Sequence, residues 1–350
     1  MLFYNTNAPF QLESGAILEN LTIAYNTYGQ LNENKSNVIW ICHALTANSD
    51  VSDWWSGIVG VGKFYDPNDY FIVCANVIGS AYGTTGPLTP QLNQRPLLDN
   101  FPTITIRDMV HAHQLLCNRL GVRSIHTLLG ASVGGQQALE WAILDDDLIQ
   151  SLVLIATNAQ HSAYGIAFNE SQRLAILADA TYGNGTIKGG RAGLIAARSI
   201  ALLSYRSYKG YNETQTDTED SKLKNYKAAS YQKYQGEKLA NRFNAYSYVT
   251  LINAMDSHNV ARNRGELADV LKGVKAKTIT IGIDSDVLFP TNEQKLLADL
   301  IPNAYYEEIT SDFGHDGFLI ETDQLTLILN RFYTGESTSE FPKFLAINYN

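Results

Sequence analysis

The sequence predicts an α/β fold with a mostly parallel central sheet, helices on both faces and an inserted helical cap. Two observations carry this prediction. Short continuously apolar runs are typical of strands covered on both faces; they span residues 37–42, 70–76, 124–129, 151–156 and 278–283. Segments of helical length alternate with these runs, and that alternation is typical of strand-helix-strand units.

The helix that follows the second of these runs has clear boundary signals. Thr105-x-x-Asp108 is a capping pattern, and Gly121 is a typical helix end. Apolar residues recur between them near helical spacing: Met109, Ala112, Leu116 and Leu120. The run at 304–309 is a further expected strand, followed by a loop and a helical tail.

The alternation of strands and helices is interrupted between about residues 161 and 248. Several helices are expected there, and a polar stretch rich in Tyr and Lys at 211–238 indicates in its middle a solvated face or loop. The strand pattern resumes at Thr278. We therefore expect residues 1–160 and 249–350 to form the core domain, and residues 161–248 to form a cap over the carboxyl edge of the sheet.

Composition narrows the class of protein. The chain has 350 residues, of which 45% are hydrophobic and 17% charged, so it should bury a substantial core. A net charge of -9 argues against a nucleic-acid partner. No apolar run approaches the roughly 20 residues of a membrane span. The three cysteines lack a C-x-x-C pair and the histidines lack metal-ligand spacing, so we expect buried reduced thiols, no metal and a cytoplasmic setting.

Ser132 lies in a short glycine-rich segment that is typical of a nucleophilic serine. Gly130-Ala131-Ser132-Val133-Gly134 fits G-x-S-x-G and lies between an expected strand and an expected helix. A sharp turn there strains the serine backbone and requires small neighbours, which leaves the hydroxyl exposed at the top of the sheet. The N–H of Val133 opens the new helix, where it can stabilise an oxyanion.

A serine nucleophile needs a base and an orienting acid, which in this arrangement follow it in the order acid, then histidine. Downstream, His258 and His315 are the candidates, and His315 is better placed because its loop follows the strand-like run at 304–309. Asp284 and Asp286 both follow the run at 278–283. Strand periodicity does not choose between them.

Two loops are expected to shape the site. A second oxyanion donor should follow an early strand, which makes the backbone N–H near Leu45 the candidate. His43 at the end of that strand is expected to order the loop by hydrogen bonds. The glycine-rich stretch at 79–87 lacks a lysine and a helix start, so we interpret it as a pocket loop.

At this level of detail the chain resembles the homoserine O-acetyltransferase family of methionine biosynthesis, within the α/β-hydrolase superfamily. The likeness covers almost the whole sequence and includes segments with no general hydrolase meaning. Among them are "LTIAYNTYGQLN", "HALTANSD", "GASVGGQQALEW", "RSIALLSYRS", "AMDSHNVARNRG", "SDVLFP" and "GHDGFLIE".

The resemblance implies specific catalytic roles. Ser132, Asp286 and His315 would form the triad, because the family's acid aligns with the aspartate of "SDVLFP". The backbone N–H groups of Leu45 and Val133 would form the oxyanion hole. The implied reaction is ping-pong transfer of an acetyl group from acetyl-CoA to the γ-hydroxyl of L-homoserine through an acyl-serine.

It also implies how the substrate and partners are held. Arg198 and Tyr205 would lie near the substrate, and Asp316 would hold the amino group of homoserine. Acetyl-CoA enters as a co-substrate and no tightly bound cofactor is implied. The partners are therefore small molecules, and the cap helices would form a homodimer.

Two departures from the family pattern leave alternatives open. Val133 stands where the family commonly has methionine, and Ala47-Asn48-Ser49 replaces the usual sequence after "HALT". Both positions bear on acyl choice, so a homoserine O-succinyltransferase or a serine O-acyltransferase on the same scaffold is the main alternative. An esterase-type hydrolase is the next, and a non-catalytic binding protein is disfavoured because all three triad positions are filled.

Overall fold

The computed structural model describes residues 1–6, 8–90 and 95–335. Within these residues eight strands form one sheet, in the order β1-β4-β6-β5-β7-β8-β9-β10, and β2 pairs with β3 separately. The strands are β1 (Leu2–Asn5), β2 (Phe10–Gln11), β3 (Ile17–Leu18), β4 (Thr22–Tyr28), β5 (Val38–Cys42), β6 (Phe71–Ala75), β7 (Ile125–Ala131), β8 (Ile149–Ile155), β9 (Lys277–Ile283) and β10 (Ala304–Ile309).

The helices alternate with these strands as far as β8 and again from β9 onward. In the first part of the chain they are α1 (Val51–Trp54), η1 (Leu98–Asn100), α2 (Ile106–Leu120) and α3 (Val133–Leu144). Between β8 and β9 lie α4 (Ala163–Leu177), α5 (Arg191–Tyr205), α6 (Tyr208–Gln215), α7 (Lys227–Ala240), α8 (Ala245–Asp256) and α9 (Leu267–Lys272). The last are α10 (Thr291–Leu300), η2 (Gly314–Asp316), α11 (Gly317–Ile320) and α12 (Thr322–Thr334).

The sheet is parallel from β6 to β10 and antiparallel at β1 and β4. All six expected strands are present within one or two residues of their predicted bounds. Parallel strands aligned in this way place their carboxyl ends at one edge, where ligands of open α/β sheets bind. The loops after β5, β7, β9 and β10 therefore meet at this edge.

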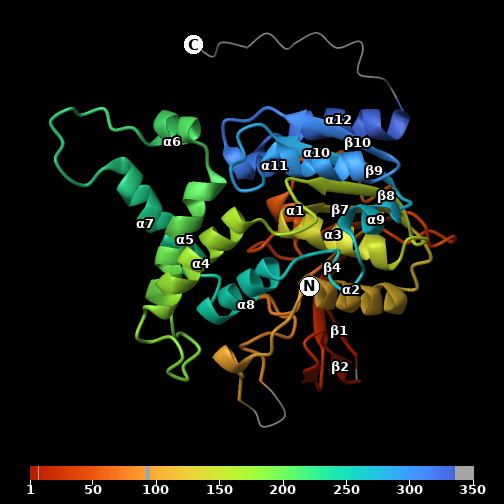
Figure 1. Cartoon of the computed structure of the whole chain (residues 1–350), viewed down its shortest axis with the longest axis horizontal. Helices are drawn as coiled ribbons and strands as arrows, with labels where there is room; N and C mark the ends of the chain where they lie inside the picture. The colour runs from red at the N-terminus through yellow and green to blue at the C-terminus, as the bar shows by residue number, and fades with distance from the viewer. Residues whose placement is uncertain (7, 91–94, 336–350) are drawn as a thin grey trace.

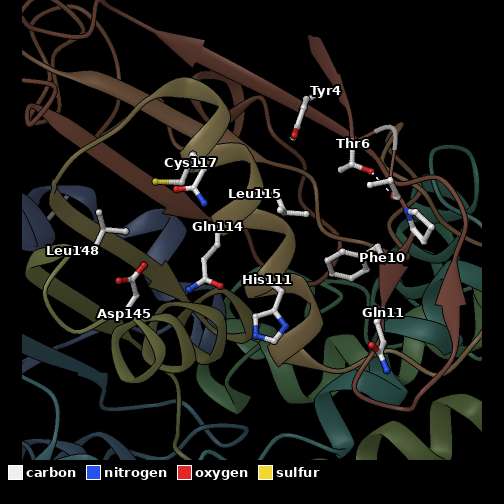
Figure 2. A pocket seen from close by; sticks show the side chains of 13 residues that line it. Tyr4, Thr6, Phe10, Gln11, His111, Gln114, Leu115, Cys117, Asp145 and Leu148 are labelled. Carbon is white, nitrogen blue, oxygen red and sulfur yellow. Dashed lines mark hydrogen bonds between the residues drawn. The ribbon is translucent and has the colours of Figure 1, made fainter.

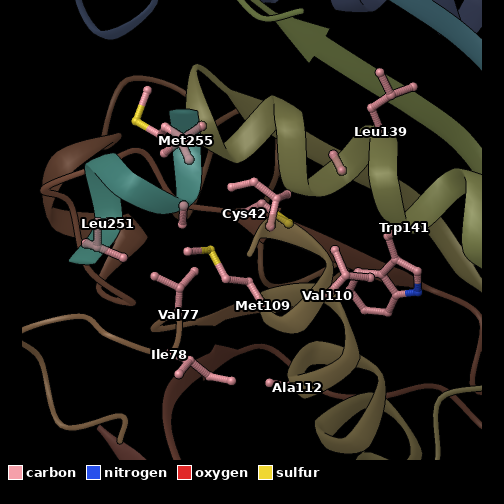
Figure 3. Packing of buried hydrophobic residues seen from close by; sticks show 14 of the residues in the cluster. Cys42, Val77, Ile78, Met109, Val110, Ala112, Leu139, Trp141, Leu251 and Met255 are labelled. Atoms are coloured by element: carbon pink, nitrogen blue, oxygen red, sulfur yellow. The ribbon is translucent and has the colours of Figure 1, made fainter. Parts of the chain in front are cut away.

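Alternate side chains along each central strand belong to two separate cores, one on each face of the sheet. On β5, Trp40 belongs to the core under α2 and α3, whereas Ile39 and Ile41 belong to the core under α1 and α12. Figure 3 shows part of the first core, to which Met109 of α2 and Leu251 of α8 both contribute. The sheet is thus covered on both faces, which explains why its strands are continuously apolar.

The boundaries of α2 are those that the sequence predicts. The Thr105 N–H donates to the Asp108 carboxylate at 2.8 Å, and the Asp108 N–H donates to the Thr105 hydroxyl at 3.3 Å. These two bonds form the capping box that the sequence predicts. Gly121 ends the helix with φ 70°, a left-handed conformation that suits glycine.

Five helices, α4 to α8, lie together at one side of the sheet (Figure 1). The polar stretch at 211–238 is helical at both ends, in α6 and α7, and its middle at 216–226 has no helix, as expected. Leu251 and Met255 of α8 are buried in the core that contains Trp40, so α8 attaches this group of helices to the sheet. In the described ranges no helix is long and apolar enough to cross a membrane.

Candidate active site

Ser132 lies in the strained turn that its sequence predicts. It follows β7 and precedes α3, with φ 58° and ψ −130°. A positive φ is uncommon for a residue other than glycine and is maintained only when the surroundings enforce it. The Ser132 N–H donates to the Ile155 carbonyl at 3.0 Å, and the Thr157 hydroxyl donates to the Ser132 carbonyl at 2.8 Å. The end of β8 therefore holds the serine backbone from both sides.

The glycines beside Ser132 are required by close backbone contacts. A Cβ on Gly130 would lie 2.1 Å from the Gly134 carbonyl oxygen, and one on Gly134 would lie 2.1 Å from the Cys42 carbonyl oxygen. Neither backbone atom can move aside as a flexible side chain would. The turn therefore closes only with glycine at these positions, as the sequence predicts.

His315 and Asp286 form a buried hydrogen-bonded pair. The distance from His315 Nδ1 to Asp286 Oδ2 is 2.6 Å. The other carboxylate oxygen accepts the N–H groups of Leu288 at 2.8 Å and Phe289 at 3.0 Å. These three hydrogen bonds fix the orientation of the carboxylate and the imidazole, and they leave Nε2 of His315 available for proton transfer.

The pKa of His315 lies above its ordinary value. Burial alone would lower this pKa, but the charge and hydrogen bond of Asp286, together with the charge of Asp316, outweigh that effect and raise it. The imidazolium form is therefore stabilised, as a base that carries a proton during the reaction requires. In the described part of the chain no hydrogen bond joins the Ser132 hydroxyl to His315, and such bonds are often long before substrate binds.

The alternative residues that the sequence left open have other partners. Asp284 is exposed, and its carboxylate accepts the Ser311 N–H at 3.0 Å. His258 is buried, with its Nε2 3.2 Å from the Asn158 carbonyl oxygen, and burial lowers its pKa to about 3. Neither residue contacts the His315–Asp286 pair through a hydrogen bond, so the geometry favours Asp286 and His315.

The two expected oxyanion donors lie on one small pocket. Leu45 and Val133 both line it, together with His43. Val133 is the first residue of α3, where a backbone N–H has no carbonyl one turn back to bond. His43 places its Nδ1 2.8 Å from the Ala44 carbonyl oxygen, and its Nε2 accepts the Val77 N–H at 3.1 Å. Burial lowers the pKa of His43 to about 4, so it is neutral and orders the loop, as predicted.

Two of the three residues expected to bind substrate are connected to His315 through ring contacts. The Tyr205 ring lies 5.8 Å from the His315 ring, and the Arg198 guanidinium lies 5.2 Å from the Tyr205 ring centroid. Arg198 has no ion pair with any residue that the structure describes. It is therefore a cation free to receive an anionic group close to the triad.

The third, Asp316, has a partner that the sequence did not indicate. Arg206 Nε lies 3.0 Å from Asp316 Oδ2. Two aromatic neighbours of His315, Phe289 and Phe318, were also missed. Arg206, Phe289 and Phe318 lie in the segments "SYRS", "SDVLFP" and "GHDGFLIE". A linear motif, however, does not show which side chains meet in the fold.

A separate cavity of about 530 Å³ lies on the outer side of α2, against the N-terminal strands (Figure 2). His111, Gln114 and Asp145 are among its lining residues, and none of the triad residues is. No group of three or more His, Cys, Asp or Glu residues able to hold a metal ion is found in the described ranges.

The strand order, a strained serine after β7 and a His–Asp pair from the loops after β9 and β10 are typical of the α/β-hydrolase class, and residues 37–322 match the family described as alpha/beta hydrolase fold. Within that class the chain belongs to the homoserine O-acetyltransferases, a family of acyltransferases. It is 45% identical to "Homoserine O-acetyltransferase" of Cyclobacterium marinum over 95% of this chain and 94% of the relative.

Solved structures agree with this fold. The homoserine O-acetyltransferase of Staphylococcus aureus is 30% identical, with a TM-score of 0.79 over 98% of this chain and 96% of that one. Esterase E22 has a TM-score of 0.87 at 21% identity, over 95% of this chain and 98% of that one. The latter likeness shows the fold alone, and it places an esterase on the same scaffold.

Proposed function

We propose that this chain transfers an acetyl group from acetyl-CoA to the γ-hydroxyl of L-homoserine, with Ser132 as the nucleophile. One observation carries the proposal at the level of the site. The buried His315–Asp286 pair, joined at 2.6 Å, stands next to the Arg198–Tyr205 pair. A base and a free cation are thus within reach of one small amino acid, and membership of the family supports the same substrate.

The first half of the reaction loads the serine. His315, oriented by Asp286, takes the proton of the Ser132 hydroxyl while the oxygen attacks the thioester carbon. The N–H groups of Leu45 and Val133 stabilise the tetrahedral oxyanion. The carbon–sulfur bond then breaks, His315 returns the proton to the CoA thiolate, and acetyl-Ser132 remains.

In the second half homoserine takes the acetyl group. Arg198 binds the carboxylate of homoserine and Asp316 its ammonium, which places the γ-hydroxyl near His315. The histidine removes the hydroxyl proton, the oxygen attacks the acetyl carbon, and Ser132 leaves with the proton restored. No tightly bound cofactor enters this scheme, and acetyl-CoA is consumed as a substrate.

The acetyl-enzyme must react with homoserine before it reacts with water. We assign the exclusion of water to a cap of residues 161–248, set between core segments 1–160 and 249–350, because Tyr205 of α5 lies against His315. The exposed side chains of Tyr164, Leu174 and Leu177 on α4 support a homodimer through this cap. Three free, buried cysteines suit a reducing compartment, so we propose a cytoplasmic enzyme.

The test is a thiol-release assay on the purified protein. Acetyl-CoA and succinyl-CoA are each compared with homoserine, with serine and with no acceptor. We expect fast release only with acetyl-CoA and homoserine, together with O-acetylhomoserine as the product. Equal release without an acceptor would make the protein a hydrolase, and preference for succinyl-CoA or serine would assign it to the alternative transferases. Sedimentation of the same preparation, with Leu174→Glu as a variant, tests the dimer.

A further inference from the structure

Arg206 pairs with the residue that directly follows the proposed base. Its Nε lies 3.0 Å from Asp316 Oδ2, and the two side chains are 26% and 16% exposed. The Arg206 guanidinium also lies 5.9 Å from the Phe313 ring centroid. In the described residues Asp316 has no other ion pair and accepts no hydrogen bond, so its second carboxylate oxygen remains available.

The loop that carries His315 is attached to the end of α5 by other contacts as well. The Ser207 hydroxyl donates to the Asp312 carbonyl, and Lys209 Nζ lies 2.7 Å from the Asp312 carboxylate. A Cβ on Gly314 would lie 2.9 Å from the Ser207 backbone nitrogen. These contacts hold the loop in place without Arg206, so the Arg206–Asp316 pair is not needed for attachment.

We propose that Arg206 is a positioning residue for the acceptor: it fixes one oxygen of Asp316 so that the other receives the substrate ammonium. The inference rests on the proposed function, because it takes Asp316 as the ammonium site. The contact is an ion pair and not a hydrogen bond, because Arg206 Nε has no hydrogen-bond partner among the described residues. An arginine side chain suits this role because its charge is permanent.

The same pair influences the proposed base. The groups facing His315 are Asp286 from the loop after β9, Asp316 from its own turn, and Tyr205 of α5. Asp316 contributes to the raised pKa of His315. By Coulomb's law, the Arg206 cation that pairs with Asp316 opposes this contribution. Loss of Arg206 should therefore raise the pKa of His315 further, and the acid limb of acylation should move to higher pH.

The experiment is a double-mutant cycle of Arg206→Gln, Asp316→Asn and the double variant. The initial burst of CoA released without acceptor, as the acetyl-enzyme forms, reports acylation, and steady-state rates report KM for homoserine. We expect R206Q to raise that KM about tenfold, the loss of one charge-assisted contact, while acylation at the pH plateau stays at the wild-type rate. In the D316N background neither the KM effect nor the shift of the acid limb should recur.

The matched control is Arg331→Gln. Arg331 pairs with Glu307 at 3.1 Å, and the side chains are 21% and 22% exposed, but this pair lies on α12 and β10. It should leave both KM and the acid limb unchanged. An equal KM effect of R206Q with and without Asp316 would overturn the proposal, and so would an unchanged KM.

Two other results can be distinguished from a failure of the proposal. If R206Q loses acylation because it does not fold, Arg206→Lys replaces it in the cycle; this variant keeps the charge and should raise KM about threefold, only when Asp316 is present. An unchanged KM in R206K would then overturn the proposal. If the wild-type protein releases no CoA with homoserine, the proposed function itself fails.

Discussion

The ring of Phe289 stacks on the ring of His315, with centroids 5.2 Å apart and an interplanar angle of 26°. The Phe289 N–H also donates to Asp286 at 3.0 Å, so one residue supports both members of the pair. On another side of the imidazole, Phe318 packs edge-on at 5.6 Å. The base therefore lies among aromatic surfaces that leave little room for water.

Phe289→Leu tests this exclusion of water. The smaller side chain should admit water to the acetyl-enzyme and raise acetyl-CoA hydrolysis without acceptor at least about threefold, while it destabilises the fold by about 1 to 2 kcal/mol. Phe332→Leu, at a buried position on α12, is the control for destabilisation alone. Equal hydrolysis in the two variants would show that Phe289 acts only in packing.

Ser132→Ala should remove the acetyl-enzyme. The fold should persist, because alanine carries the same backbone strain at φ 58° as serine does. We expect turnover to fall by at least about a thousandfold, since triad residues act as a unit. Mass spectrometry of the intact protein after mixing with acetyl-CoA should show one added acetyl group in the wild type and none in the variant. Acetylation of the variant would place the nucleophile elsewhere.

The rate of acylation should fall at acidic pH. The midpoint of this fall should lie above about 6.5, which is the ordinary pKa of histidine. A general base must be neutral, so activity is lost as the pH falls through the pKa of His315, and that pKa is raised. Asp316→Asn removes one of the charges that raise it, so the limb should move to lower pH. A limb that stays in place in this variant would contradict the assignment.

Glu293 on α10 is the control for the pH profile. Burial, with a smaller contribution from the charge of Asp286, raises the pKa of Glu293 to about 7, so this carboxyl titrates in the same range. Its charge is not among the causes that act on His315. Glu293→Gln should therefore leave the acid limb in place, and loss of the limb in this variant would assign it to Glu293.

Arg242 connects the helical insertion to the loop that carries Leu45, the proposed oxyanion donor. Its Nη1 donates to the Thr46 carbonyl at 2.6 Å, next to Leu45. Arg242→Ala should let this loop move and lower kcat about tenfold, less than the 10² to 10³ expected for loss of a donor itself. Both half-reactions should slow equally, because each forms an oxyanion. Arg191→Ala is the control, since Arg191 bonds the exposed Asn241 instead.

Glu140 on α3 is a buried acid between two arginines. Its side chain is 3% exposed and lies 2.7 Å from Arg107 and 2.6 Å from Arg264. Glu140→Gln should lower the free energy of unfolding by about 3 kcal/mol, because Arg264 loses its carboxylate partner and Arg107 keeps only its pair with Glu13. Urea unfolding measures this change. Glu307→Gln, whose pair with Arg331 is more exposed, should lower it by under about 1 kcal/mol.

Local rules accounted for much of the fold. The strands were predictable because burial on both faces requires continuous apolar runs, and α2 because Thr105 and Asp108 form a capping box. The turn at Ser132 followed from the need for small residues beside a strained backbone. Each of these signals lies within a few residues of the structure that it specifies.

Contacts between distant segments were not predictable in the same way. Asp284 and Asp286 occupy similar places in the sequence, and only the fold shows that Asp286 meets His315, 29 positions away. The pairing of Arg206 with Asp316 likewise depends on how the end of α5 meets η2. Periodicity carries no information about such pairs, so they required the three-dimensional structure.

The parallel pairing of β8 with β9, with Ser151 opposite Lys277, brings together segments separated by the whole helical insertion. In polymer terms the insertion is a closed loop, and doubling the length of a flexible loop costs only about 0.6 kcal/mol in closure entropy. We therefore expect the sheet to tolerate large changes of length in the exposed parts of the insertion, away from α8, whose Leu251 and Met255 belong to the core. A lineage can rebuild the segment that carries Arg198 and Tyr205, the residues proposed to bind the acceptor, while the serine turn on β7 is inherited intact.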